Sequence, residues 1–141
     1  MTKVFWDTML FIYLLEDSPV YGERVATLAR RIEARGDILC TSALVVAEVL
    51  TGLEKRGDAV LIARCRDFFA SAAIVVLPFD LQSASHFAQL RSRHQLAAPD
   101  AIHLACAASY GVDLFVTQDK RLAGKIVPGI RFIVDLAQDV L

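Results

Sequence analysis

The chain has 141 residues, of which 55% are hydrophobic, and its formal net charge is −1. This length is typical of one domain with a core large enough to need no disulfides or structural metal, so we expect a single domain over residues 1–141. The near-neutral charge argues against a protein that coats DNA electrostatically, but it is compatible with a nuclease whose metal ion supplies local positive charge.

In the first half of the chain, short apolar runs typical of buried strands alternate with helical patterns. Gly36 and Gly57 are expected C-terminal caps of two helices, and Thr41 or Ser42 is expected to cap the start of the second of these. The predicted elements are a strand at Lys3–Trp6, helices at Met9–Leu15 and Tyr21–Arg35, a strand at Ile38–Cys40 and a helix ending near Arg56.

The second half continues the alternation. Pro99 is expected to open one helix at its first position and Gly111 to end it. The predicted elements are helices at Ala59–Ser71 and Leu81–His94, the helix from Pro99, a short helical turn from Lys120, and strands at Ile74–Leu77, Leu114–Thr117 and Ile130–Val134. The alternation predicts a three-layer α/β/α sandwich around a central, mostly parallel, five-stranded twisted sheet.

Four acidic residues are expected to meet at one edge of this sheet. Asp7 and Asp119 follow two of the predicted strands, and Asp100 and Glu48 lie on helices that start from the same edge. Ligands of open α/β sheets bind beyond the carboxyl ends of the strands, which is where these acids fall.

Each acid also has a purely structural interpretation. Asp7 can cap a helix, Asp100 can complement a helix dipole, and Asp119 can form a turn with its own backbone. Glu48 is flanked by apolar residues, so we expect it on a largely buried helix, where an ionised carboxylate needs a salt bridge or a metal. The joint occurrence of all four favours a shared site.

Four carboxylates at one edge would repel one another and raise some of their pKa values. A hard divalent cation removes that penalty, and ligands that are all oxygen atoms suit Mg²⁺, with Mn²⁺ as a substitute. Such a site supports hydrolysis of phosphodiester bonds with one or two metal ions. Neither cysteine nor histidine is spaced for a zinc site.

These segments resemble the motifs of the PIN-domain family, in order and over essentially the whole chain. The matching segments are VFWDTMLFIYLLE, TSALVVAEVLTGL, PDAIHLACA and LFVTQDKRL. The chain is most similar to the VapC-type toxins of VapBC toxin–antitoxin pairs. The resemblance implies a magnesium-dependent endoribonuclease that cuts RNA, is neutralised by a small antitoxin and forms a homodimer.

The resemblance also implies a role for each acid. Asp7 and Asp100 would be the main metal ligands, and Glu48 and Asp119 would complete the cluster directly or through water. The hydroxyls of Thr8 and Thr117 would orient carboxylates. Met9 stands where the family more often has a small polar residue, which puts one such contact in doubt.

Basic residues near the acids are candidates for phosphate contacts, with an ordinary solvated surface as the alternative. They are Lys120 and Arg121, directly after Asp119, and Arg91, Arg93 and His94, which we place on the loop that leads to Asp100. His103, one turn from Asp100, could approach the site, although a partly buried packing histidine is the favoured interpretation.

The excess of apolar residues suggests a buried interface. Met9–Leu15 and the helix Tyr21–Arg35 could form a groove for an antitoxin helix, with core packing as the alternative. Cys40, Cys65 and Cys106 suggest buried thiols in a reducing cytoplasm. No apolar run is long enough for a membrane helix, and Asp7 argues against a signal peptide, so we expect no membrane association.

The residues around Asp7 disfavour two other classes of protein. Phosphoaspartate hydrolases carry a second acid two residues after the first strand's Asp, where this chain has Met9. A receiver-like module needs an adjacent acid pair that Trp6 and Asp7 do not supply. A housekeeping RNA-processing nuclease and a non-cleaving RNA- or protein-binding scaffold stay open as alternatives, and the presence of all four acids favours an enzyme.

Overall fold

The computed structural model describes residues 1–138 and 141. Its five strands form one sheet in the order β3-β2-β1-β4-β5, and every neighbouring pair is parallel. The strands are β1 (Lys3–Trp6), β2 (Ile38–Ser42), β3 (Val75–Leu77), β4 (Leu114–Thr117) and β5 (Phe132–Asp135). Because β1 lies in the centre, the residues that follow β1, β2 and β4 emerge side by side at one edge.

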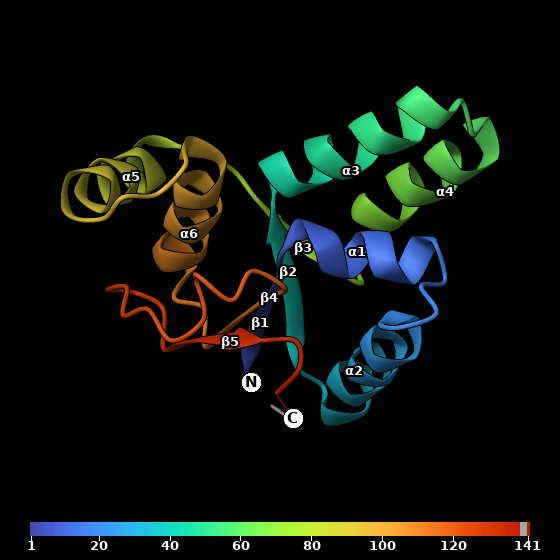
Figure 1. The fold of residues 1–141 in the computed structure, drawn as a ribbon, viewed down its shortest axis with the longest axis horizontal. Coiled ribbons are helices and arrows are strands. Elements are labelled where there is room, and N and C mark those ends of the chain that lie inside the picture. The colour runs from blue at the N-terminus through green and yellow to red at the C-terminus, as the bar shows by residue number, and fades with distance from the viewer. Residues whose placement is uncertain (139–140) are drawn as a thin grey trace.

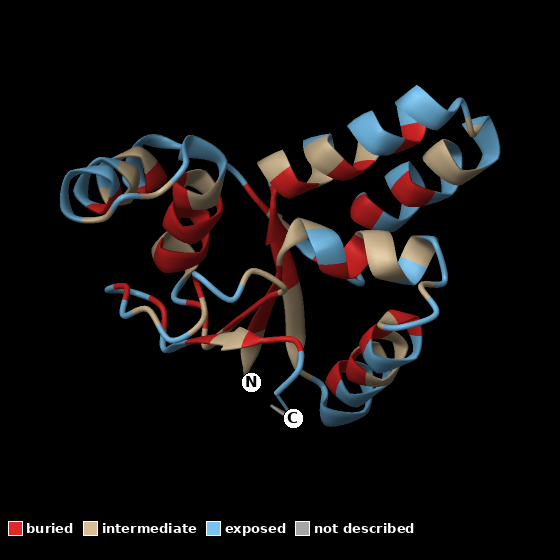
Figure 2. Ribbon diagram, in the orientation of Figure 1, coloured by how far each residue is buried: buried red, intermediate tan, exposed pale blue. Residues whose placement is uncertain are grey.

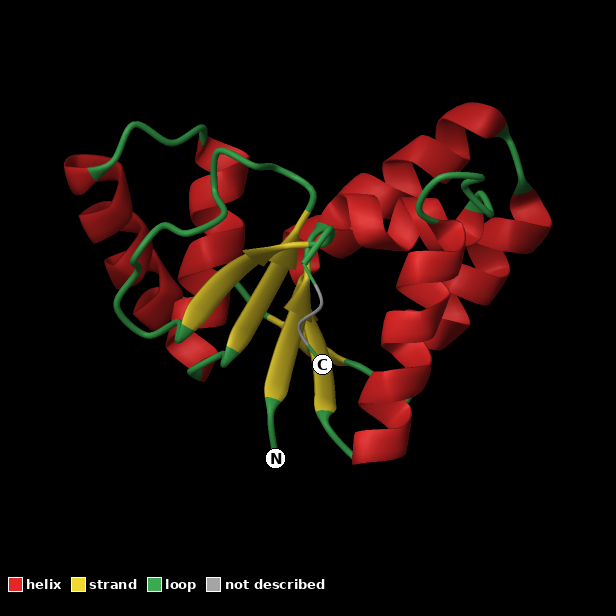
Figure 3. Cartoon of the chain, turned by 60° about the horizontal axis from the view of Figure 1, so that its bottom comes forward, coloured by secondary structure: helices red, strands yellow, loops and turns green. Residues whose placement is uncertain are grey.

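Helices cover both faces of the sheet, as predicted for a three-layer sandwich (Figure 1). Helices α5 and α6 lie on one face, α1 and α2 lie on the other, and the hairpin of α3 and α4 extends past the end of the sheet (Figures 1 and 3). The helices are α1 (Thr8–Leu15), α2 (Gly22–Arg35), α3 (Ala43–Arg56), α4 (Ala59–Phe69), α5 (Leu81–Arg93) and α6 (Ala98–Tyr110).

The core lies between the central strands and the inner faces of the helices (Figure 2). Phe5 of β1 and Phe115 of β4 are fully buried and stack with ring centroids 4.6 Å apart. Helix α6 is buried on most sides, and its alanines, including Ala101 and Ala105, let it pack closely against the sheet. The first turn of α6 is therefore held in a fixed position beside the ends of the strands.

Most predicted elements are confirmed, with corrections at their ends. The predicted range Ile38–Cys40 was too short, because Thr41 and Ser42 are also buried in β2: the Thr41 hydroxyl donates to the Trp6 carbonyl over 2.8 Å. Ser42 is the cap of α3, since its Oγ accepts from the backbone N–H of Val45.

The last part of the chain differs more from the prediction. The short helical turn expected from Lys120 is present as turns over residues 120–124, where the Ala123 N–H donates to the Asp119 carbonyl over 3.4 Å, but it does not continue into a helix. Strand β5 begins at Phe132, where pairing with Leu114 of β4 starts, and not at Ile130. The apolar side chain of Ile130 is buried before the strand begins, which is why composition alone placed the start too early.

Cys40, Cys65 and Cys106 are buried free thiols, as expected. Burial raises the pKa of Cys40 to about 12 and that of Cys106 to about 11, so both stay protonated at neutral pH. Across residues 1–138 and 141, no helix has both the length and the apolar character needed to cross a membrane.

Candidate active site at the carboxyl edge of the sheet

Asp7 lies at the centre of the edge, directly after β1. Its backbone N–H donates to the Val116 carbonyl of β4 over 3.0 Å, which extends the pairing of these strands by one residue. One carboxylate oxygen, Oδ1, accepts from the Thr8 N–H at the start of α1, and the other, Oδ2, accepts from the Thr117 hydroxyl, both at 2.8 Å. Asp7 is therefore a helix cap, as the structural interpretation expected, and its second oxygen is hydrogen-bonded to Thr117.

Asp119 lies beside Asp7 and pairs with an arginine. Its backbone N–H donates to the Thr117 hydroxyl over 3.0 Å, so one threonine contacts both acids. The Arg121 guanidinium donates to both carboxylate oxygens, at 3.1 and 2.8 Å, and its backbone N–H donates to Oδ1. These hydrogen bonds lower the pKa of Asp119, and they make the turn that the structural interpretation of Asp119 predicted.

Asp100 is half-buried in the first turn of α6. Burial raises its pKa above the usual value, and the negative charges of Asp7 and Asp119 raise it further. Within the described residues its carboxylate takes part in no hydrogen bond or ion pair. The structure thus brings Asp7, Asp100 and Asp119 close enough for their charges to interact, and it leaves Asp100 without a donor.

Glu48 reaches this edge from α3 and is held by two side chains. Its Oε1 accepts from the Thr8 hydroxyl and lies next to Nε2 of His103, both at 2.8 Å. The expectation that Glu48 lies on a largely buried helix was wrong: the buried residues of α3 are Val45, Val49 and Leu53, and the Glu48 side chain is 37% exposed. Helix α3 packs mainly against α4 and α1 and extends past the sheet, which leaves one side of the helix open (Figure 1).

For His103 the sequence left two interpretations open, a residue of the site and a packing histidine. His103 is 2% exposed, and its Nδ1 lies 2.8 Å from the Ser42 hydroxyl. The preferred interpretation, a packing histidine, describes its burial but misses the hydrogen bonds to Ser42 and Glu48. The available signal was its position one helical turn after Asp100, on a helix that otherwise consists largely of small apolar residues.

The predicted RNA-contact residues are exposed, at two places. Arg91 and Arg93 lie in the last turn of α5, not on the loop that follows, and Arg91 stands over the ring of Phe87 at 5.9 Å. Lys120 and Arg121 lie in the turn directly after Asp119. Arg121 is the one whose charge reaches the acids, since it also lowers the pKa of Asp100.

The edge of the sheet that carries Asp7, Glu48, Asp100 and Asp119, here called the acidic edge, has the oxygen ligands that a hard divalent cation needs. In the structure these oxygens do not surround one point. In the described part of the chain, no three His, Cys, Asp or Glu side chains form a ready-made metal cluster. The charges nevertheless fit a cation, because Asp100 is half-buried, lacks a donor and faces two further carboxylates. Both oxygens of Asp119 are occupied by Arg121, so a metal that used them would displace this arginine.

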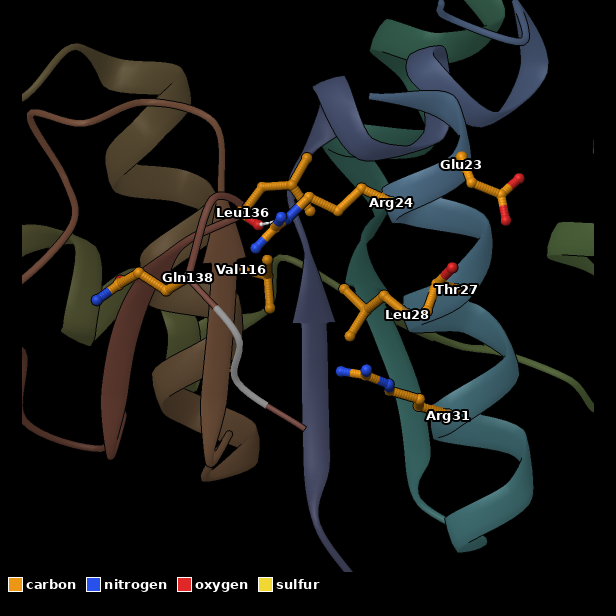
Figure 4. A pocket seen from close by; sticks show the side chains of 8 residues that line it. All are labelled: Glu23, Arg24, Thr27, Leu28, Arg31, Val116, Leu136 and Gln138. Carbon is orange, nitrogen blue, oxygen red and sulfur yellow. Dashed lines mark hydrogen bonds between the residues drawn. The ribbon is translucent and has the colours of Figure 1, made fainter. Parts of the chain in front are cut away.

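A separate cavity of about 440 Å³ lies between α2 and the sheet (Figure 4). Its lining includes Arg24, Arg31 and Val116 but none of the four acids. The Arg24 guanidinium donates to the carbonyls of Leu136 and Ala137, and the Arg31 guanidinium donates to the Leu141 carbonyl. These arginines connect α2 to Leu136, Ala137 and Leu141.

Comparison with solved structures shows the same architecture in other proteins. The VapBC2 complex from Rickettsia felis, bound to a DNA fragment from its promoter, gives a TM-score of 0.76 at 15% identity over 95% of this chain and 98% of that chain. DNA-bound VapBC from Salmonella typhimurium gives 0.74 at 24% identity, over 97% of this chain and 100% of that chain. VapC20 from Mycobacterium tuberculosis, a toxin that cleaves the sarcin-ricin loop, gives 0.63 at 18% identity, over 79% and 86%.

The sequence comparisons give a family and no individual relative. No curated protein matches the chain. The PIN domain family matches residues 4–125, a range that contains all four acids together with Thr8, His103 and Thr117. With its all-parallel sheet and its VapC-like fold, the chain belongs to the PIN domain family.

Proposed function

We propose that this protein is a Mg²⁺-dependent endoribonuclease that hydrolyses RNA phosphodiester bonds, with Mn²⁺ as a possible substitute, and that it acts as the toxin of a toxin–antitoxin pair. The observation that carries the proposal is the environment of Asp100. Its half-buried carboxylate has no donor within the described residues and faces the negative charges of Asp7 and Asp119. Such an arrangement is costly unless a cation neutralises it.

The residues of the chain have distinct tasks in this proposal. Asp7 and Asp100 bind the metal directly, and Glu48 and Asp119 bind it directly or through water. The Thr117 hydroxyl fixes the orientation of Asp7, and the Thr8 hydroxyl does the same for Glu48. A bound Mg²⁺ lowers the pKa of a water molecule and neutralises charge that develops on the phosphate.

The basic residues around the edge bind the RNA backbone. Lys120 and Arg121 are next to Asp119. The Arg121 guanidinium, which now binds both oxygens of the Asp119 carboxylate, can bind two oxygens of an RNA phosphate in the same bidentate way. Arg91 and Arg93 extend the positive surface along α5. These contacts are to phosphates and carry no sequence preference.

The proposed partners are a small antitoxin and a second copy of the chain. Met9 and Leu14 are 39% and 41% exposed, which leaves apolar surface on α1, the helix that follows Asp7, for a partner to cover. The fold is that of structures determined as VapBC complexes. Cytoplasmic localisation stays a prediction from the three free thiols.

The alternatives are a housekeeping RNA-processing nuclease and a PIN-like scaffold that binds without cleaving. A scaffold has no need of an unpaired carboxylate beside two other acids, so the environment of Asp100 favours the enzyme. The choice between toxin and housekeeping nuclease depends on the partner, which the geometry of the acids does not determine.

The test is cleavage of a mixed cellular RNA pool by the purified protein with Mg²⁺, with EDTA, and with Asp7→Asn. We expect cleavage that requires the metal, and a loss on the order of 100-fold or more for Asp7→Asn because a charged ligand becomes neutral. The matched control is Asp17→Asn, an exposed position with φ of 49° that Asn tolerates. Cleavage that survives EDTA or Asp7→Asn would contradict the proposal, and no cleavage by the folded protein would favour the scaffold.

A further inference from the structure

A buried histidine connects the sheet edge to Glu48. His103 lies on α6 with its side chain 3% exposed, between Ser42 at the end of β2 and Glu48 on α3. Its two ring nitrogens each lie 2.8 Å from an oxygen, Nδ1 from the Ser42 Oγ and Nε2 from the Glu48 Oε1. One imidazole therefore joins α6 to the end of β2 and to α3, the helix that directly follows β2.

The hydrogens along this connection can be assigned from the donors available. The Ser42 Oγ already accepts from the Val45 N–H over 3.1 Å, so its single hydrogen is free to point at the Nδ1 of His103. Nδ1 is then the acceptor and Nε2 carries the hydrogen. The Nε2–H donates to the Glu48 Oε1, which is the direction that an ionised carboxylate requires.

The carboxylate of Glu48 is thereby held on one side only. Oε1 accepts from both the Thr8 hydroxyl and the His103 ring, while Oε2 has no hydrogen bond within the described residues. The side chain is 37% exposed and Oε2 has no hydrogen-bond partner there, so Oε2 is free to bind a ligand while Oε1 is held from within. A carboxylate fixed in this way presents one defined oxygen.

We propose that His103 is a positioning residue: it holds Oε1 of Glu48 through an Nε2–H hydrogen bond, with Ser42 fixing the ring tautomer, so that Oε2 is presented to the divalent cation. This inference rests on the proposed metal-dependent function. The ring itself is too deeply buried to contact RNA, so its effect on the reaction passes through Glu48. Loss of a hydrogen bond that orients a metal ligand typically lowers metal affinity about 10-fold to 100-fold.

The experiment measures Mn²⁺ binding to the metal-free protein by titration calorimetry, and RNA cleavage in parallel, for His103→Leu and His103→Gln. Leucine keeps the apolar volume and removes both hydrogen bonds, whereas the glutamine amide can place an N–H where Nε2 stood. We expect His103→Leu to weaken Mn²⁺ binding about 10-fold to 100-fold. We expect His103→Gln to keep most of the Mn²⁺ affinity of the wild-type protein. His86→Leu on α5 is the matched control, and thermal unfolding of every variant verifies the fold.

Each variant is also made in a Glu48→Gln background. If His103 acts through Glu48, then His103→Leu adds no further loss of affinity there. An equal loss in both backgrounds, or an equal loss for Leu and Gln, would show a merely structural role and overturn the inference. A wild-type protein that neither binds Mn²⁺ nor cleaves RNA would refute the proposed function instead.

A second readout is independent of metal and of activity. The ¹⁵N chemical shifts of the His103 ring report its tautomer, and we expect Nδ1 without hydrogen and Nε2 with it. Ser42→Ala removes the donor that fixes this tautomer and should shift both nitrogens. An Nδ1–H tautomer in the wild-type protein would contradict the proposed direction of the hydrogen bonds, even if the protein proved to be an active nuclease.

Discussion

The acids at the carboxyl edge of the sheet are held in different ways. Glu48 is fixed from inside the protein, by a buried imidazole and by a hydroxyl at the start of α1. Asp119 is paired with Arg121, whose side chain is 85% exposed, and Asp100 has no donor at all in the described part of the chain. The fold therefore holds Glu48 and Asp7 in fixed orientations, through His103, Thr8 and Thr117, and leaves Asp100 without a hydrogen-bond donor beside two other negative charges.

This contrast shows how order and affinity can be divided within one site. Each hydrogen bond from a buried side chain stabilises the fold by about 1 kcal/mol, and it fixes geometry without any ligand. An uncompensated carboxylate costs stability, and the cost is recovered when a cation binds. Replacing a residue that orients a carboxylate, such as Thr117, and replacing the uncompensated Asp100 should therefore change the free energy of unfolding and the metal affinity in different proportions.

The largest effect is expected for Asp100→Asn, with opposite signs for metal binding and folding. Because burial and the charges of Asp7 and Asp119 raise the pKa of Asp100, its contribution to stability is fully present below its ordinary value of 3.8 and is lost as the pH rises through the raised pKa. At neutral pH without metal, we expect the variant to be more stable by ~0.5 kcal/mol. Mn²⁺ affinity should fall on the order of 100-fold.

Denaturant unfolding from pH 3 to pH 8 without metal, and calorimetric titration with Mn²⁺, measure the two effects. Asp67→Asn is the matched control, since it removes the same charge from an exposed position on α4. If Asp100→Asn lost stability at neutral pH together with Mn²⁺ affinity, Asp100 would have a structural role.

The next effect concerns Thr117, which contacts both Asp7 and Asp119. Thr117→Val keeps the buried shape but removes the donor to Asp7 and the acceptor for the Asp119 N–H, so we expect a loss of about 1–3 kcal/mol in the free energy of unfolding. Metal affinity should also fall by about 10-fold.

Thr41→Val on β2 is the matched variant for this comparison. Thr41 is equally buried, and its hydroxyl donates to a backbone carbonyl of β1, not to a carboxylate. It should lose comparable stability and leave the Mn²⁺ affinity unchanged. If both threonine variants weakened Mn²⁺ binding equally, the effect of Thr117 would be one of packing and not of orienting Asp7.

The smallest effect is expected for Arg121→Gln. The guanidinium competes with a cation for Asp119 and lowers the pKa of Asp100, so its removal should strengthen Mn²⁺ binding by about two- to fivefold. Arg35→Gln is the control, because Arg35 pairs with Asp37 at the same spacing in sequence but away from the acids. Weaker Mn²⁺ binding by Arg121→Gln would show that this arginine supports the site instead of competing with the metal.

The sequence predicted those elements whose ends are marked by a change in residue type. β1 and β4 match their predicted ranges because apolar runs are bounded by Asp7 and by Gln118. β2 was predicted two residues short, since nothing in the residue types Thr41 and Ser42 shows that their hydroxyls find partners inside the protein. The burial of polar side chains depends on partners that are distant in sequence.

The same reason limited the prediction of the site. The four acids could be placed at one edge because the carboxyl ends of parallel strands share an edge. Asp7 and Asp119 follow strands, and Asp100 and Glu48 lie on helices that start from that edge. The pKa rise expected for clustered acids occurs at Asp100, but Asp119 shifts the other way because Arg121 pairs with it. The link from Ser42 through His103 to Glu48 spans 61 and 55 residues of sequence and has no local signature.

The central position of β1 also determines when the edge is complete during synthesis. The contact of Thr8 with Glu48 joins residues 40 apart, whereas that of Asp7 with Thr117 joins residues 110 apart. A ribosome-bound chain can therefore close the first contact long before β4 has been made, because domains form as their segments emerge. The part of the edge that contains Asp119 forms only when β4 pairs with β1, so we expect a translation product that ends before β4 to lack the proposed nuclease activity.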